Sequence, residues 1–353
     1  MRKIISAVLL FVLCLGLFGC GAEGKYVSVT PHPHRDEYRE LGALYASSYR
    51  EMRGALSQLI ADGADHGIIF LLDLDGKTGN SYMESIVGNL YRTDPVAVYA
   101  VESVKYELGT NTGRNAIAVE IQYKKTKSEI QRIKQVENMD QVLESLGEVL
   151  ESVETSLVLR VDTYEARDFA LLVQQFADEN PDKIMEIPQV MSAVYPEEGD
   201  ARVIELSFSY RTDPQELLHM KELVWPVFTA AELYVQGGRE TMDKYTQLYN
   251  FLMQRYDYTF ATSATPTYSL LQEGTGDCRA FASVYSAICN KAGLNCRVIS
   301  GTRNGEIWYW NQIEDDGRVF YVDLLRSYQR GGMELLLPEQ MADYSWDEIY
   351  YGN

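Results

Sequence analysis

Two stretches of this chain show the same order of predicted strands and helices, and this internal repeat limits the architecture more than any other feature. Each stretch has a strand, a helix, a two-strand hairpin and a closing helix. Tyr123 matches Tyr210 and Glu129 matches Glu216, each pair 87 residues apart. A repeated β-α-β-β-α unit predicts small sheets that each bury helices against one face.

The repeat also predicts domain boundaries. We expect the first unit to span residues 63–153 and the second to span residues 154–238. The apolar run Ile68–Leu72 predicts the first strand, and the pattern over Ser128–Leu150 predicts a helix that closes the first unit. Neither unit carries a catalytic constellation, so spacing or binding is the function we expect of this region.

The N-terminus has the form of an export signal. In residues 1–20, Arg2 and Lys3 precede an apolar run that ends in Gly19-Cys20. This ending resembles a bacterial lipobox. The resemblance implies that Cys20 carries lipid and anchors the chain to the extracytoplasmic face of the cell membrane. An ordinary signal peptide or an uncleaved anchor is the alternative interpretation.

Two short segments separate this signal from the repeats. Residues 21–36 contain Gly, Pro and hydroxyl residues, which indicates a tether. Residues 37–62 have apolar residues at helical spacing, which predicts a helix that packs on the first unit. His32 and His34 lie in the tether without a third ligand nearby, so we expect no metal site and no metal cofactor.

Charge restricts the partners. The chain has 32 basic and 51 acidic residues and a formal net charge of −19. Such a chain repels nucleic acid and anionic membranes, so membrane attachment would depend on the lipid. The 25 tyrosines are consistent with ordinary packing or with a surface that stacks on glycans or peptides.

Three cysteines remain in the expected folded part: Cys278, Cys289 and Cys296. An odd number leaves at least one free thiol unless two chains pair. Cys289 and Cys296 could form a disulfide outside the cytoplasm, and two buried free thiols are the alternative.

The last third, residues 239–353, contains a candidate nucleophile. Cys278 follows Gly276-Asp277 and opens a helical pattern, where the helix dipole and free amides favour a thiolate. Predicted strands follow at Cys296–Gly301 and Trp308–Ile313, and a third ends in Val322-Asp323. This order and spacing resemble the transglutaminase-like superfamily, which has a papain-like cysteine fold.

The resemblance implies roles for three positions. Cys278 would be the nucleophile and Asp323 the acid that orients a histidine base. The family's histidine falls at Trp308, 15 residues before Asp323. An indole has a donor N–H only and cannot take a proton from a thiol. We therefore predict a degenerate site that needs no cofactor.

The predicted fold class is α+β, with two tandem β-α-β-β-α repeats before a transglutaminase-like domain. The predicted function is a cell-surface lipoprotein whose domain binds a peptide or cell-wall polymer without catalysis. The alternative is a divergent cysteine acyl-transfer enzyme, either a protease, an amidase or a protein-crosslinking enzyme, that uses Cys278 and Asp323.

Overall fold

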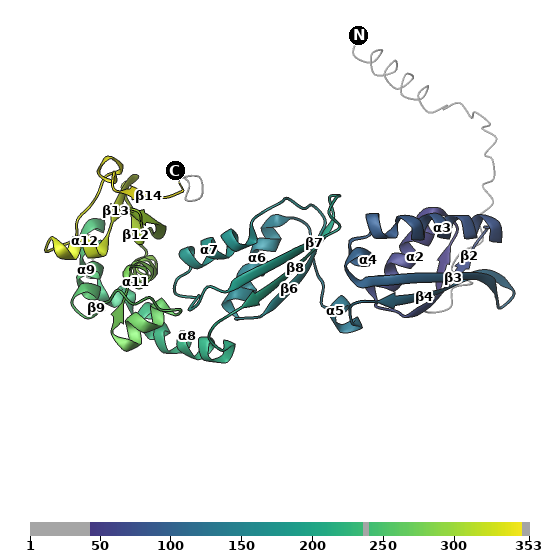
Figure 1. Ribbon diagram of the computed structural model, residues 1–353, viewed down its shortest axis with the longest axis horizontal. Helices are drawn as coiled ribbons and strands as arrows, with labels where there is room; N and C mark the ends of the chain where they lie inside the picture. The colour runs from purple at the N-terminus through teal and green to yellow at the C-terminus, as the bar shows by residue number, and fades with distance from the viewer. Residues whose placement is uncertain (1–42, 236–239, 348–353) are drawn as a thin grey trace, which may run out of the picture. The chain divides into compact units, whose positions relative to one another are not determined.

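Three four-stranded sheets, each packed with helices, make up the part of the chain that the structure describes (Figure 1). The structure is a computed structural model, and it describes residues 43–235 and 240–347. The predicted export signal, Cys20 and the tether lie outside the described residues. The α+β class is confirmed. None of the described helices is long and apolar enough to cross a membrane.

The first sheet has the strand order β1-β2-β4-β3, with β1 parallel to β2 and the other pairs antiparallel. Along β4, Ile117, Val119 and Ile121 are buried under helices, whereas Ala118 and Glu120 are exposed on the opposite face. This alternation is typical of a sheet with one open face. The elements are β1 (Leu44–Ala46), α2 (Tyr49–Ala61), β2 (His66–Leu71), α3 (Gly76–Thr93), α4 (Pro95–Ala100), β3 (Val101–Asn111), β4 (Arg114–Tyr123) and α5 (Lys127–Gln131).

The second sheet repeats this pattern with the order β5-β6-β8-β7 and the same pair directions. Helices α6 and α7 pack against one of its faces (Figure 1). The elements are β5 (Lys134–Val136), α6 (Met139–Glu151), β6 (Ser156–Val161), α7 (Phe169–Glu179), β7 (Gln189–Tyr195), β8 (Arg202–Ser209), α8 (Pro214–Thr229) and η2 (Ala231–Tyr234).

Two predicted helices differ in the structure: one begins later than expected, and the other is divided into separate elements. The helix expected over residues 37–62 begins only at Tyr49, because Ser48 caps it and Leu44–Ala46 pairs with β2 as a strand. The helix expected over Ser128–Leu150 is three elements, namely α5, β5 and α6.

The division of Ser128–Leu150 into three elements moves the boundary between the two units. Strand β5 and helix α6 belong to the second sheet, so each sheet begins with a short strand and a helix that the sequence reading had assigned elsewhere. Both short strands have three residues, which is too few for a periodic pattern. The two tandem repeats stay a prediction.

The third sheet has the order β13-β12-β11-β14 and packs on α11. Strands β9 and β10 form a two-stranded pair, and β10 packs near α11. The elements are α9 (Thr241–Met253), β9 (Asp257–Tyr258), α10 (Pro266–Tyr268), η3 (Ser269–Glu273), β10 (Thr275–Gly276), α11 (Cys278–Lys291), β11 (Cys296–Arg303), β12 (Glu306–Asp315), β13 (Arg318–Val322), α12 (Leu324–Gln329), η4 (Pro338–Gln340) and β14 (Tyr344–Ser345).

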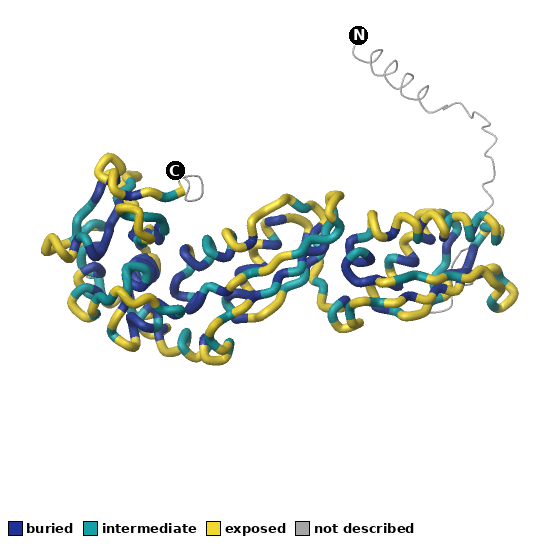
Figure 2. Tube along the Cα trace, viewed as in Figure 1, coloured by how far each residue is buried: buried dark blue, intermediate teal, exposed yellow. Residues whose placement is uncertain are grey.

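Helix α8 joins the second sheet to this last region. Its buried residues Leu217, Val224 and Phe228 belong to the hydrophobic core around α9 and α11. Burial is concentrated between the helices and the sheets (Figure 2). The helix predicted to close the second unit therefore also supports the region that carries Cys278.

Candidate functional site

Cys278 is the first residue of α11, a helix of 14 residues whose middle is almost entirely buried. Asp277 caps the helix by accepting a hydrogen bond from the Ala280 N–H at 2.9 Å. A Cβ on Gly276 would lie 2.6 Å from the Ala280 Cβ, so only glycine fits directly before this cap. The sequence Gly-Asp-Cys thus places the thiol at the N-terminus of a rigid helix.

The surroundings of the thiol favour its protonated form. Burial is the main cause that raises the pKa of Cys278 to about 11, and the negative charges of Asp277 and Asp323 add to it. Backbone N–H groups of Tyr309 and Arg279 act in the opposite direction. The helix N-terminus therefore does not produce the thiolate that the sequence favoured.

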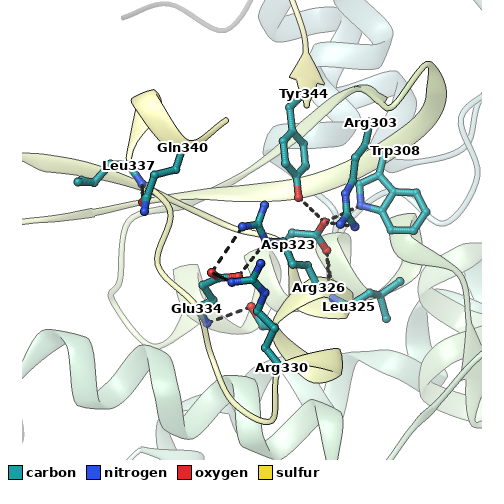
Figure 3. A network of polar contacts seen from close by, with 11 residues as sticks. Arg303, Trp308, Asp323, Leu325, Arg326, Arg330, Glu334, Leu337, Gln340 and Tyr344 are labelled. Atoms are coloured by element: carbon teal, nitrogen blue, oxygen red, sulfur yellow. Dashed lines mark hydrogen bonds and ion pairs between the residues drawn. The ribbon is translucent and has the colours of Figure 1, made fainter. Parts of the chain in front are cut away.

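Asp323 is the centre of a polar network (Figure 3). Its side chain is 1% exposed, and its Oδ1 accepts the backbone N–H groups of Leu325 and Arg326 as the cap of α12. Its Oδ2 accepts Trp308 Nε1–H at 2.9 Å, Arg303 at 3.0 Å and the Tyr344 hydroxyl at 2.7 Å. Five donors thus satisfy both carboxylate oxygens.

The strand registers explain this convergence. In the pairing of β11 with β12, Gly301 lies opposite Trp308, and Arg303 is two residues further along β11. Strand β14 pairs Tyr344 with Arg303. A Cβ on Gly301 would collide with the Ser345 carbonyl oxygen, so this glycine permits the approach of β14.

The arrangement lacks an evident base for the thiol. Trp308 presents its N–H to Asp323, and an indole nitrogen has no acceptor capacity. His219 does not replace it, because its side chain is 67% exposed on α8 with Nδ1 3.8 Å from Glu222. Within residues 43–235 and 240–347, no cluster of three or more His, Cys, Asp or Glu side chains could hold a metal ion.

A cavity of about 300 Å³ lies beside the start of α11. Hydroxyl groups and two carboxylates, those of Glu273 and Asp277, supply its polar lining. Phe260, in the loop between two lining residues, is 87% exposed and packs edge-on against Tyr258. The hydroxyl-bearing residues of the lining are Thr259, Thr262, Ser263, Ser269 and Thr275.

Three residues of the site around Asp323 were predicted from the sequence, and two were not. Asp323 accepts the Trp308 N–H, and its charge acts on the Cys278 thiol, so the three predicted residues belong to one site. Arg303 and Tyr344 were not predicted, since Arg303 follows the expected strand Cys296–Gly301 and no motif marks Tyr344. Cys289 and Cys296 are buried free thiols.

Comparison with known families agrees with this geometry. The model of the transglutaminase-like superfamily matches residues 229–353. These residues form a transglutaminase-like domain. The match includes Cys278, Trp308 and Asp323, and it begins at the end of α8. No curated protein matches the chain.

Several solved structures show low similarity to the chain. A candidate cysteine protease from Cytophaga hutchinsonii is 12% identical with a TM-score of 0.27, and the match covers 45% of this chain and 70% of that one. The periplasmic domain of TgpA from Pseudomonas aeruginosa is 16% identical with a TM-score of 0.24, covering 39% of this chain and 62% of that one. A transglutaminase is 8% identical with a TM-score of 0.28, covering 56% of each chain.

Proposed function

We propose that this protein is a lipid-anchored protein of the cell surface whose transglutaminase-like domain binds a peptide or cell-wall polymer and does not catalyse acyl transfer. The anchor is the lipid expected on Cys20, and the binding region is the cavity beside α11. The observation that carries the proposal is the 2.9 Å hydrogen bond from Trp308 Nε1 to Asp323.

This hydrogen bond replaces the one on which the family's chemistry depends. In a nucleophile–base–acid unit, the acid orients an imidazole that takes the proton of the nucleophile. Here the acid receives an indole N–H, an arginine and a tyrosine hydroxyl instead. The thiol has its pKa raised to about 11, and no imidazole among the described residues is placed to accept its proton.

The cavity supports binding as the remaining activity. Its hydroxyls and carboxylates can pair with the amide and hydroxyl groups of a peptide or glycan, and exposed Phe260 offers a face for stacking. Co-sedimentation of the full chain with insoluble cell-wall polymer tests this. We expect Phe260→Ser to weaken binding, whereas Tyr328→Ser, also an exposed aromatic, should leave it unchanged.

A divergent acyl-transfer enzyme is the second candidate. It is favoured by Cys278 at a helix N-terminus, with the N–H groups of Tyr309 and Arg279 directed at its sulfur. Peptide amide hydrolysis and amine incorporation by the wild type, abolished by Cys278→Ala, would establish this candidate. Equal background from both proteins would reject it.

The reactivity of Cys278 gives a direct measurement. Because its pKa is raised to about 11, we expect iodoacetamide to label it about a hundredfold more slowly at pH 8 than an ordinary thiol. The rate should increase about tenfold per pH unit up to pH 10. Peptide mass spectrometry separates Cys278 from buried Cys289 and Cys296, and rapid labelling at pH 7 would contradict the non-catalytic assignment.

Restoring the base tests whether the rest of the site is competent. We expect Trp308→His to gain amide hydrolysis about 10²–10⁴-fold above the wild-type background, since that is the usual contribution of a general base. Trp308→Phe is the matched control, and the gain must vanish when Cys278→Ala is added. A folded Trp308→His variant without any gain would show that the base is not the only missing part.

A further inference from the structure

One end of the open face of the second sheet is covered by residues from the region of the first sheet. Tyr99 of α4 is 1% exposed, and its hydroxyl lies 3.3 Å from Glu205 of β8. Lys125 Nζ lies 2.6 Å from the same carboxylate oxygen and 4.7 Å from the centre of the Tyr99 ring. Val203 of β8 is fully buried in the core of the first sheet as a result. An aromatic ring beside a cation therefore fills this patch.

The strand registers identify the same positions on the first sheet. Ile204 pairs with Val194 in the second sheet, and Ile117 pairs with Leu108 at the corresponding place in the first. The next pair of facing residues is Tyr195–Val203 in the second sheet, and it corresponds to Gly109–Ala116 in the first.

At these positions the first sheet is hollow. Gly109 and Ala116 line a depression of about 230 Å³, together with Ile68, Glu107 and Ala118. Gly109 and Ala116 occupy the positions of Tyr195 and Val203, and apart from the adjoining residues no heavy atom lies within 4 Å of the place where a Gly109 Cβ would be. Ile68 remains 41% exposed at its edge. The first sheet thus keeps a position for a side chain that nothing among the described residues fills.

The first sheet also has a carboxylate at this place, but on the neighbouring strand. In the second sheet, the pair of facing residues is Ala193 and Glu205, with the carboxylate on β8. In the first sheet, the corresponding pair is Glu107 and Ala118, with the carboxylate on β3. No basic side chain is among the described residues that line the hollow. A cation held next to an aromatic ring in the hollow could therefore pair with Glu107.

We propose that the hollow on the first sheet binds a partner protein that presents an aromatic side chain beside a lysine or arginine. The ring fills the space over Gly109 and Ala116, and the cation pairs with Glu107. A second copy of this chain does not offer its Tyr99 and Lys125, because both are already bound to Glu205. The inference is independent of the site at Cys278.

The probe is acetyl-lysyl-tyrosine amide, titrated into the isotope-labelled full chain and followed by amide chemical shifts. We expect shifts confined to β3 and β4 around the hollow. Gly109→Tyr, which places in the hollow the residue found at 195, should abolish them. Glu107→Gln should weaken the affinity about threefold, which is the usual effect of an exposed ion pair. Gly88→Tyr adds the same ring on exposed α3 and should change nothing.

A second variant shows whether binding is lost without loss of the fold. Ala118→Lys places a cation opposite Glu107 and should weaken binding while the thermal midpoint is retained. Shifts that survive both Gly109→Tyr and Ala118→Lys would overturn the proposal. So would equal shifts from acetyl-lysyl-alanine amide, or no shift at all. Binding to anionic vesicles that Gly109→Tyr abolishes, without a dipeptide response, would assign the hollow to lipid instead.

Discussion

One carboxylate, that of Asp323, connects four segments of the transglutaminase-like domain. Strand β11 contributes Arg303, β12 contributes Trp308, β14 contributes Tyr344, and α12 contributes two backbone N–H groups. A buried charge is tolerated only when it is paired and hydrogen-bonded, and this one is both. Asp323 therefore has a structural role that is sufficient to explain its presence without catalysis.

This role predicts a large loss of stability for Asp323→Ala. The substitution leaves the Arg303 guanidinium, whose side chain is 23% exposed, without its ionic partner. Removing one partner of a buried pair costs about 3–5 kcal/mol in the free energy of unfolding. Urea unfolding measures this against Asp343→Ala, an exposed acid on the same segment as Tyr344. Equal stability of the two variants would show that the network contributes little.

At the scale of the element, the Asp277 cap of α11 stabilises the helix and also disfavours ionisation of the Cys278 thiol. The Asp277 carboxylate accepts the Ala280 N–H, and its charge helps to raise the pKa of Cys278. A charge that assists the helix dipole thus opposes ionisation of the first residue. The same residue explains why a helix N-terminus does not by itself produce a reactive cysteine.

Asp277→Asn separates these two effects. Asparagine is an equally good cap, so the free energy of unfolding should change by less than about 0.5 kcal/mol. Loss of the negative charge should lower the pKa of Cys278 and increase its alkylation rate at pH 8 a few-fold. Asp168→Asn, at the cap of α7, is the matched control and should not alter labelling. An unchanged rate in Asp277→Asn would mean that the charge of Asp277 does not contribute to the pKa of Cys278.

At the scale of the whole molecule, tertiary contacts join elements that are distant in sequence. Glu205 of the second sheet receives Tyr99 and Lys125, and Asp182 pairs with Lys291 of α11 at 2.7 Å. The core around α11 also includes Val153 and Met185 from the region of the second sheet. The transglutaminase-like domain is therefore packed against the segment that precedes it.

Buried phenols predict a loss of stability at alkaline pH. Burial raises the pKa of Tyr123, Tyr210 and Tyr249 to about 12, from 10.0. A folded-state pKa above the unfolded value gives stability that is complete below pH 10 and decreases as the pH rises toward 12. Urea unfolding between pH 8 and 11 measures it.

Tyr249→Phe provides the control for this pH dependence. Because Tyr249 is 2% exposed, the variant should lose less stability between pH 9 and 11 than the wild type. Tyr328→Phe, at a position that is 60% exposed, should follow the wild type. A stability that does not vary between pH 9 and 11 would mean that these phenols have the same pKa in the folded and the unfolded chain.

The sequence by itself determined the local features of this protein. Glycine before Cys278 and the apolar pattern after it predicted the helix, and the spacing to Asp323 predicted the strands that carry the site. Hydrophobic periodicity acts over one or two turns or strands, so these elements were readable without the fold. The α+β class followed from these elements, and their order and spacing gave the resemblance to the transglutaminase-like superfamily.

Only the tertiary structure decided which short strands begin the first two sheets and which side chains bind Asp323. Strands β1 and β5 have three residues each and exist because they pair with β2 and β6. Arg303 and Tyr344 reach the carboxylate through the pairing of β11 with β14, two segments about 40 residues apart in the chain. Such contacts depend on which strands become neighbours, and a linear pattern of residues contains no measure of that.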